Sequence, residues 1–214
     1  MMNNVKQKIK KSDTHAKQGL GNELVILHDM IIDAEECILL LQNAFIYHNA
    51  KFLAECKVKI AAIKKSGASL AGDMEQTVRD NPDMKPYVPI PAHLSGIGNH
   101  IEKLSECIDR KISENILFSD KAVKETIFLL QRLNEILTPT ADIVLARNTF
   151  LSMYVEESQV GVGKMATEYA TLHEERLIKG VCLPAASSLY ITMLDAIKSI
   201  SWHSKEIAIG LAGL

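Results

Sequence analysis

The chain has 214 residues, with 24 lysine and arginine residues against 26 aspartate and glutamate residues, so its formal net charge is −2. Hydrophobic residues make up 47% of the sequence and aromatic residues only 5%, which argues against an all-β protein and against disorder. The near-neutral charge argues against a nucleic-acid-binding protein, which needs a strongly basic face. The length suits one domain or two small ones.

The first 18 residues form a basic segment with five lysines and one aspartate. No apolar run follows the lysines, so the segment is not a secretory signal. We expect a solvated, disordered arm, with weak contact to anionic lipid or a partner as the alternative. No stretch approaches 18 uninterrupted apolar residues, so any contact with a membrane is expected to be indirect.

The four cysteines lie within stretches of helical pattern, and no two of them form a CxxC pair. Zinc fingers and redox motifs are therefore not expected. Buried, reduced thiols in a cytoplasmic protein are the better interpretation. The four residues are Cys37, Cys56, Cys107 and Cys182.

Long stretches of helical apolar spacing run from about residue 18 to the end of the chain. A proline-rich segment at residues 81–91 interrupts them, Ser119 can cap a helix, and Gly180 can end one. Helices of this length joined by short turns form antiparallel bundles, so the sequence predicts an all-α fold. The predicted helices cover residues 19–47, 50–79, 90–112, 120–147, 150–178 and 184–211.

The third and sixth predicted helices resemble each other at an offset of 103 residues. At this offset Ile97 matches Ile200, and His100 matches His203. Duplication of a three-helix unit explains these matches, so we predict two repeated three-helix bundles within one compact body. The predicted bundles are residues 19–115 and 116–214.

Motifs of common enzymes are missing from the sequence. It contains no GxSxG, P-loop, GxGxxG or HExxH motif, and no glutamate stands three residues before a histidine, as di-iron bundles require. Carboxylates one helical turn apart, such as Glu102 and Glu106, are no more frequent than chance predicts and indicate a solvated face. We therefore expect a protein that is not an enzyme.

Histidines on the third and sixth predicted helices are the more suggestive polar residues. His93 and His100 are seven residues apart and share one helix face, and His203 is the counterpart of His100 in the repeat. A hydrogen-bonded core histidine and a shared metal or anion site both remain open. Trp202, the single tryptophan, fits either a packing anchor or a side chain that faces a partner.

Three segments resemble motifs of the PhoU-like family of phosphate-uptake regulators. The run ILFSDKAVKETIFLL, which begins at Ile116, resembles the opening of the family's second repeat. The runs SGIGNHIEKLS, from Ser95, and KSISWHSKEIA, from Lys198, resemble the segment that closes each repeat. The resemblance implies two three-helix bundles packed side by side. It also implies a non-enzymatic protein that acts on phosphate transport and phosphate signalling.

The sequence departs from the family at its metal motif, which places an acid and an aspartate four residues apart in each repeat. These positions are occupied here by Ser95 and Asn99 in the first repeat, and by Lys198 and Trp202 in the second. Hard cations such as Fe³⁺ and Mg²⁺ need anionic oxygen ligands, which these four side chains do not supply. We therefore expect neither the family's metal site nor another cofactor.

The same replacements suggest a polar or anion site. Lys198 places a positive charge where the family binds cations, and Asn99, His100 and His203 lie at neighbouring positions of the two predicted repeats. Together these four residues could attract an anion, phosphate included.

The function that follows from the resemblance is a regulatory or accessory role in phosphate transport or phosphate signalling. Such a protein would act by protein–protein contact in the cytoplasm, with a phosphate transporter or its sensor as the partner. Long amphipathic helices also permit a homodimer. The alternatives are a helical-bundle metal-binding protein and a self-associating structural module, both unrelated to phosphate.

Overall fold

Six α-helices make up the structure, a computed structural model that describes residues 2–80, 85 and 87–212, with side chains for residues 22–79, 85 and 87–212. These residues contain no β-strand, which confirms the predicted all-α fold. The helices are α1 (Met2–Tyr47), α2 (Lys51–Asp80), α3 (Ile90–Ser113), α4 (Asp120–Ala146), α5 (Thr149–Ile178) and α6 (Pro184–Ala212).

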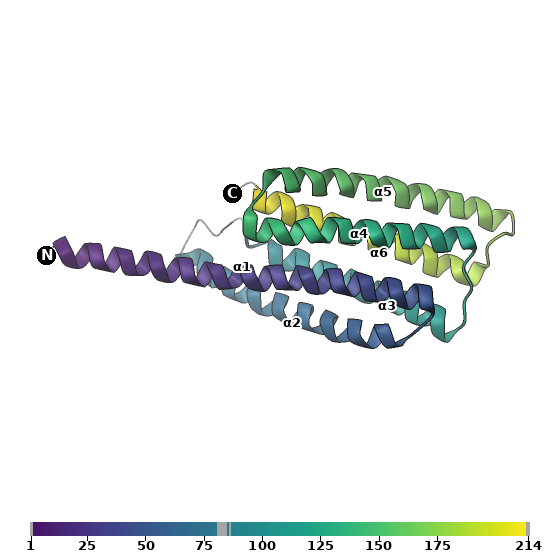
Figure 1. Ribbon diagram of the computed structural model, residues 1–214, viewed down its shortest axis with the longest axis horizontal. Coiled ribbons are helices and arrows are strands. Elements are labelled where there is room, and N and C mark those ends of the chain that lie inside the picture. Colours follow the sequence, from purple (N-terminus) through teal and green to yellow (C-terminus); the bar gives the residue numbers. More distant parts are fainter. Residues whose placement is uncertain (1, 81–84, 86, 213–214) are drawn as a thin grey trace.

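The start of α1 differs from the expectation. The helix begins at Met2 instead of near residue 19, so residues 2–18, expected as a disordered arm, continue α1 as helix. This extension runs beyond the other helices at one end of the molecule (Figure 1). Its sequence contains five lysines, which are good helix formers, and no proline, so no residue forces the helix to stop.

The helix ends predicted from capping residues are confirmed. The Ser119 side chain accepts a hydrogen bond from the backbone N–H of Ala122 at 3.3 Å, which caps α4. Gly180 follows α5 with a φ of 70°, a conformation that glycine adopts without strain. Part of the proline-rich break, at residues 81–84 and 86, lies outside the described residues, and Pro89 immediately precedes α3.

The helices form two three-helix bundles that pack side by side, α1–α3 and α4–α6 (Figure 1). Between the bundles α3 packs against α6 and α1 packs against α4. Helix α2 contacts α1 and α3, and α5 contacts α4 and α6, so these two helices complete the bundles away from the central contact. The expected boundary at residues 115 and 116 falls in the connection between α3 and α4.

Helices α3 and α6 bury side chains at equivalent positions of their matching segments. This pattern is what a duplicated unit would give, and the duplication stays a prediction. Where α6 carries a serine in the core, its hydroxyl donates to a carbonyl in its own helix, as from Ser204 to Ile200 at 2.9 Å. The buried positions include Ile97, Ile101 and Leu104 of α3, and Ile200, Ser204 and Ile207 of α6.

Gly96 allows α3 to approach α6 closely. A methyl group at this position would overlap the His203 ring at Cε1 and Nε2. Gly72 of α2, by contrast, has no heavy atom within 4 Å of such a methyl group. The two glycines therefore differ in packing, although both lie inside helices.

We expect Gly96→Ala to lower the free energy of unfolding by about 1–3 kcal/mol, because the added methyl group must displace His203. Gly72→Ala, the matched control, should raise it by up to about 1 kcal/mol, because alanine is the better helix former. Chemical unfolding monitored by circular dichroism measures both changes. Equal stabilisation by the two substitutions would contradict the close contact at Gly96.

Candidate functional site

Three histidines meet where α3 packs on α6, between the two halves of the molecule. The Nδ1 atoms of His93 and His203 lie 3.1 Å apart, a hydrogen-bond distance at which one ring donates and the other accepts. The ring centres of His100 and His203 are 5.7 Å apart. The sequence places His100 and His203 on matching faces, but the closer pair in the structure is His93 and His203.

Trp202 lies beside this histidine cluster (His93, His100 and His203). Its ring centre is 4.8 Å from that of His203 and 5.6 Å from that of His93, both in T-shaped contacts. The side chain nevertheless remains 43% exposed. Trp202 therefore packs on the cluster and also presents an aromatic surface to solvent.

Burial lowers the pKa of each histidine in the cluster. For His203, burial and the positive charges of protonated His93 and His100 lower the pKa to about 4, and Glu206 opposes this shift. Burial also lowers the pKa of His93, against the opposing charge of Glu206, and that of His100. The cluster is therefore neutral at pH 7, and its rings act as hydrogen-bonding groups without charge.

A groove of about 440 Å³ opens beside the cluster and brings α3, α5 and α6 together. The Lys198 ammonium in this groove lies 3.9 Å from Asp195, and both side chains are well exposed. Of the four residues of the predicted anion site, His100, Lys198 and His203 line the groove, whereas Asn99 is exposed and does not. The remaining lining residues are Gln159, Gly163, Ser199 and Trp202.

The positions of the family's metal motif hold other contacts in this structure. The Ser95 side chain packs against Gly67 of α2, so that a methyl group there would lie 2.8 Å from Ser95 Oγ. Across the part of the chain that the structure describes, no three or more His, Cys, Asp or Glu side chains are arranged to hold a metal ion.

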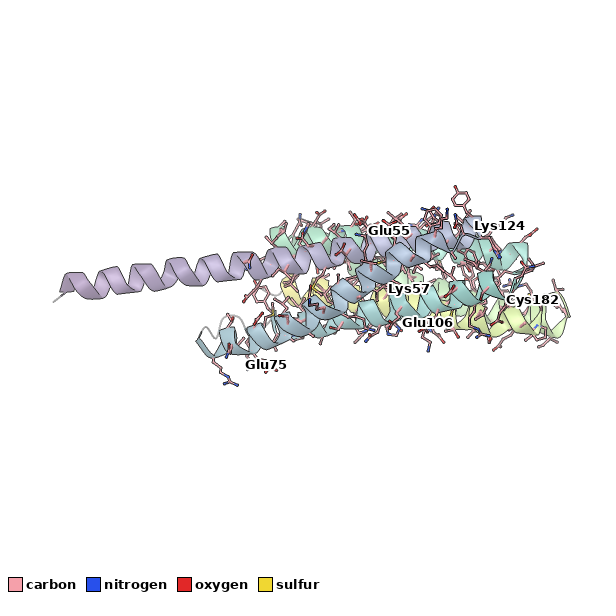
Figure 2. The ribbon with its side chains drawn as sticks, turned by 90° about the horizontal axis from the view of Figure 1, so that it is seen from below. Glu55, Lys57, Glu75, Glu106, Lys124 and Cys182 are labelled. Carbon is pink, nitrogen blue, oxygen red and sulfur yellow. The ribbon has the colours of Figure 1, made fainter. Side chains whose placement is uncertain are left out.

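A second groove, of about 420 Å³, runs between α2 and α3. Lys57 of α2 and Glu106 of α3, both labelled in Figure 2, are among the residues that line it. Lys64 pairs with Glu102 at 2.6 Å, and Lys57 pairs with Asp109 at 3.3 Å. These exposed ion pairs fit the predicted solvated face, and each contributes about 0–1 kcal/mol to stability.

A buried ion pair in the second half of the molecule was missed by the sequence analysis. Glu125 of α4 is only 3% exposed, and both its oxygens accept hydrogen bonds from Arg176 of α5, at 3.1 and 2.8 Å. The Tyr190 hydroxyl of α6 donates to the same carboxylate at 2.5 Å. The sequence does contain an indication of this pair, because Glu125 is a charged residue on the apolar face of its helix, between Ala122 and Leu129.

Comparisons with known proteins identify the fold. The sequence matches no protein-family model and no curated protein sequence. The structure matches the crystal structure of PhoU from Pseudomonas aeruginosa with a TM-score of 0.80, over 92% of this chain and 96% of that chain, at 12% sequence identity. The chain adopts a PhoU-like fold.

Within this PhoU-like fold, the histidine cluster and the adjacent groove lie where the two three-helix bundles meet. At 12% identity the match shows the fold alone and assigns no role to these residues. None of the helices in the described ranges is both long and apolar enough to cross a membrane.

We expect the stability of the PhoU-like bundle to decrease as the pH falls from about 6.5 toward 4. The pKa of His203 is about 4 in the native state and 6.5 ordinarily, so the unfolded chain binds more protons in this range. Protonation therefore favours unfolding. The His203→Gln variant should show a shallower pH dependence, by up to about one proton, in chemical unfolding measured at a series of pH values.

If His203→Gln left the pH dependence of the unmodified chain unchanged, His203 would not be a strongly shifted group.

Proposed function

We propose that this chain is a regulatory or accessory protein of phosphate transport or phosphate signalling that acts by contact with another protein. The observation that carries the proposal is the match to PhoU over nearly the full length of both chains. The match includes all six helices in one fold, so it is not limited to a common helical hairpin. The partner would be a phosphate transporter or its sensor.

An exposed apolar face on α5 supports action by protein contact. Phe150, Met153 and Tyr154 are 81%, 58% and 46% exposed, and their spacing places them on one side of the first turns of the helix. Large apolar side chains grouped on a surface mark interaction sites in soluble proteins, and tyrosine is frequent among the residues that dominate binding energy. This face is therefore our candidate contact surface.

One serine–histidine pair among the described residues has the arrangement of a nucleophile and its base, and its surroundings fit a non-enzymatic role. Ser187 Oγ lies 2.8 Å from His173 Nε2, which resembles a nucleophile and its base. The other ring nitrogen of His173 is buried without a hydrogen-bond partner, so no acid orients the imidazole. Burial also lowers the pKa of His173. This pair therefore lacks the third member of a catalytic triad.

Affinity purification of the full-length chain from its native cells, grown with high and low phosphate, tests the proposal. We expect mass spectrometry to identify a phosphate-transporter or phosphate-sensor component. The double variant Phe150→Ala/Met153→Ala should lose this component at least tenfold, because hot-spot residues contribute more than about 1–2 kcal/mol each. Val58→Ala, at a 72% exposed position of α2, is the matched control and should retain it.

Deletion of the gene gives an independent measurement, since phosphate uptake by the cells should change and return on complementation. Unchanged uptake, together with no recovered transport or sensor component, would contradict the proposed function. Light scattering over a concentration series distinguishes the self-associating alternative, in which the same double variant would convert a dimer to a monomer.

A further inference from the structure

We propose that the groove between α3, α5 and α6 binds a nucleotide, with its base on the Trp202 indole and its phosphate at Lys198. The proposal goes beyond a simple anion site, because it assigns a role to the exposed aromatic ring as well as to the positive charge. It does not depend on the proposed role in phosphate transport. A groove of about 440 Å³ falls within the ~300–1,000 Å³ of small-molecule sites.

The aromatic surface is the first observation. Trp202 is held in place by ring contacts with His93 and His203, yet it stays 43% exposed and lines the groove. A large aromatic side chain fixed on one side and open on the other is suited to stacking on a planar ligand. Any of the nucleic-acid bases can stack on tryptophan, since every base has a π face.

The charge of the groove is the second observation. Lys198 lies one helical turn before Trp202, so the ammonium and the indole face the same side of α6. The seven residues that line the groove include no carboxylate. The nearby Asp195 pairs with Lys198 only at 3.9 Å and is 70% exposed, which makes it a weak competitor for a phosphate.

Uncharged hydrogen-bonding groups complete the groove. Gln159 on α5 offers an amide, and Ser199 on α6, whose hydroxyl donates to the Asp195 carbonyl at 2.9 Å, keeps its oxygen as an acceptor for a ribose hydroxyl or a base amino group. Gly163, one turn after Gln159, leaves room along α5, because a methyl group there would approach only the Gln159 amide at 3.8 Å. With Lys198 as the single formal charge, the groove suits a monophosphate and favours no particular base.

Fluorescence of Trp202 tests the proposal directly, because this residue is the single tryptophan of the chain. Titration of the full chain with adenosine monophosphate should give saturable quenching, with excitation at the red edge of the indole band to avoid absorption by the base. Adenosine should bind about tenfold more weakly, because it lacks the charge-assisted bond to Lys198. Lys198→Met should lower the affinity for adenosine monophosphate by a similar factor.

Lys57→Met is the control, since it removes the same charge from an exposed position on α2 and should leave the affinity unchanged. Two calorimetric titrations separate the contributions of the phosphate and the base. The first titrates the unmodified chain with inorganic phosphate, and the second titrates Trp202→Phe with adenosine monophosphate. We expect phosphate alone to bind at least tenfold more weakly than adenosine monophosphate, and Trp202→Phe to retain binding through its smaller ring.

Three results would overturn the proposal. Equal affinity for inorganic phosphate and adenosine monophosphate would leave an anion site that ignores the base. Equal affinity for adenosine and its monophosphate would remove the role of Lys198. An absence of saturable quenching and of heat would leave no nucleotide site at all. None of these results bears on recovery of a transport or sensor component, which tests the separate proposal on function.

Discussion

The packing of α3 on α6 is the contact on which the rest of this structure depends. Each of these helices also packs within its own bundle, so their contact joins the two hydrophobic cores into one. Gly96 permits the close approach, and the His203 ring fills the space that a side chain at this position would take. The bond between His93 and His203 supplies a polar partner for rings that have left water.

The groove follows from the same contact. Because His203 turns toward α3, its neighbour Trp202 lies at the edge of the contact, packed on two histidines and partly open to solvent. Lys198, one turn earlier, then lies beside the indole, and α5 provides the opposite wall. The groove thus contains residues from both bundles, so a ligand bound there would respond to any change in how the two halves pack.

Much of this fold could be predicted from the sequence, because helical spacing and capping residues are local signals. Ser119 and Gly180 marked helix ends correctly, and the matching segments of α3 and α6 pointed to His100 and His203, whose ring centres lie 5.7 Å apart. The start of α1 was not predicted, because a lysine-rich segment fits both a helix and a solvated arm, and helix propensity alone does not decide between them.

Contacts between helices were harder to predict than the helices themselves. The match between the two segments pairs His203 with His100, but His93 lies nearer to His203, because the local pattern of a helix does not encode how it is placed against its neighbour. For the same reason the pattern did not show that Asn99 is exposed and outside the groove. Glu125 was overlooked for a related reason, because its partners Arg176 and Tyr190 come from other helices.

We infer that the α3–α6 contact unites the two bundles in one cooperative unit. Native-state hydrogen exchange measures this cooperativity, because amides in the core of each bundle report the free energy of the opening that exposes them. We expect the most protected amides of α3 and α6 to exchange with the same free energy and the same denaturant dependence, those of global unfolding. If one bundle exchanged at a clearly lower free energy while the other stayed protected, the two bundles would be separate units.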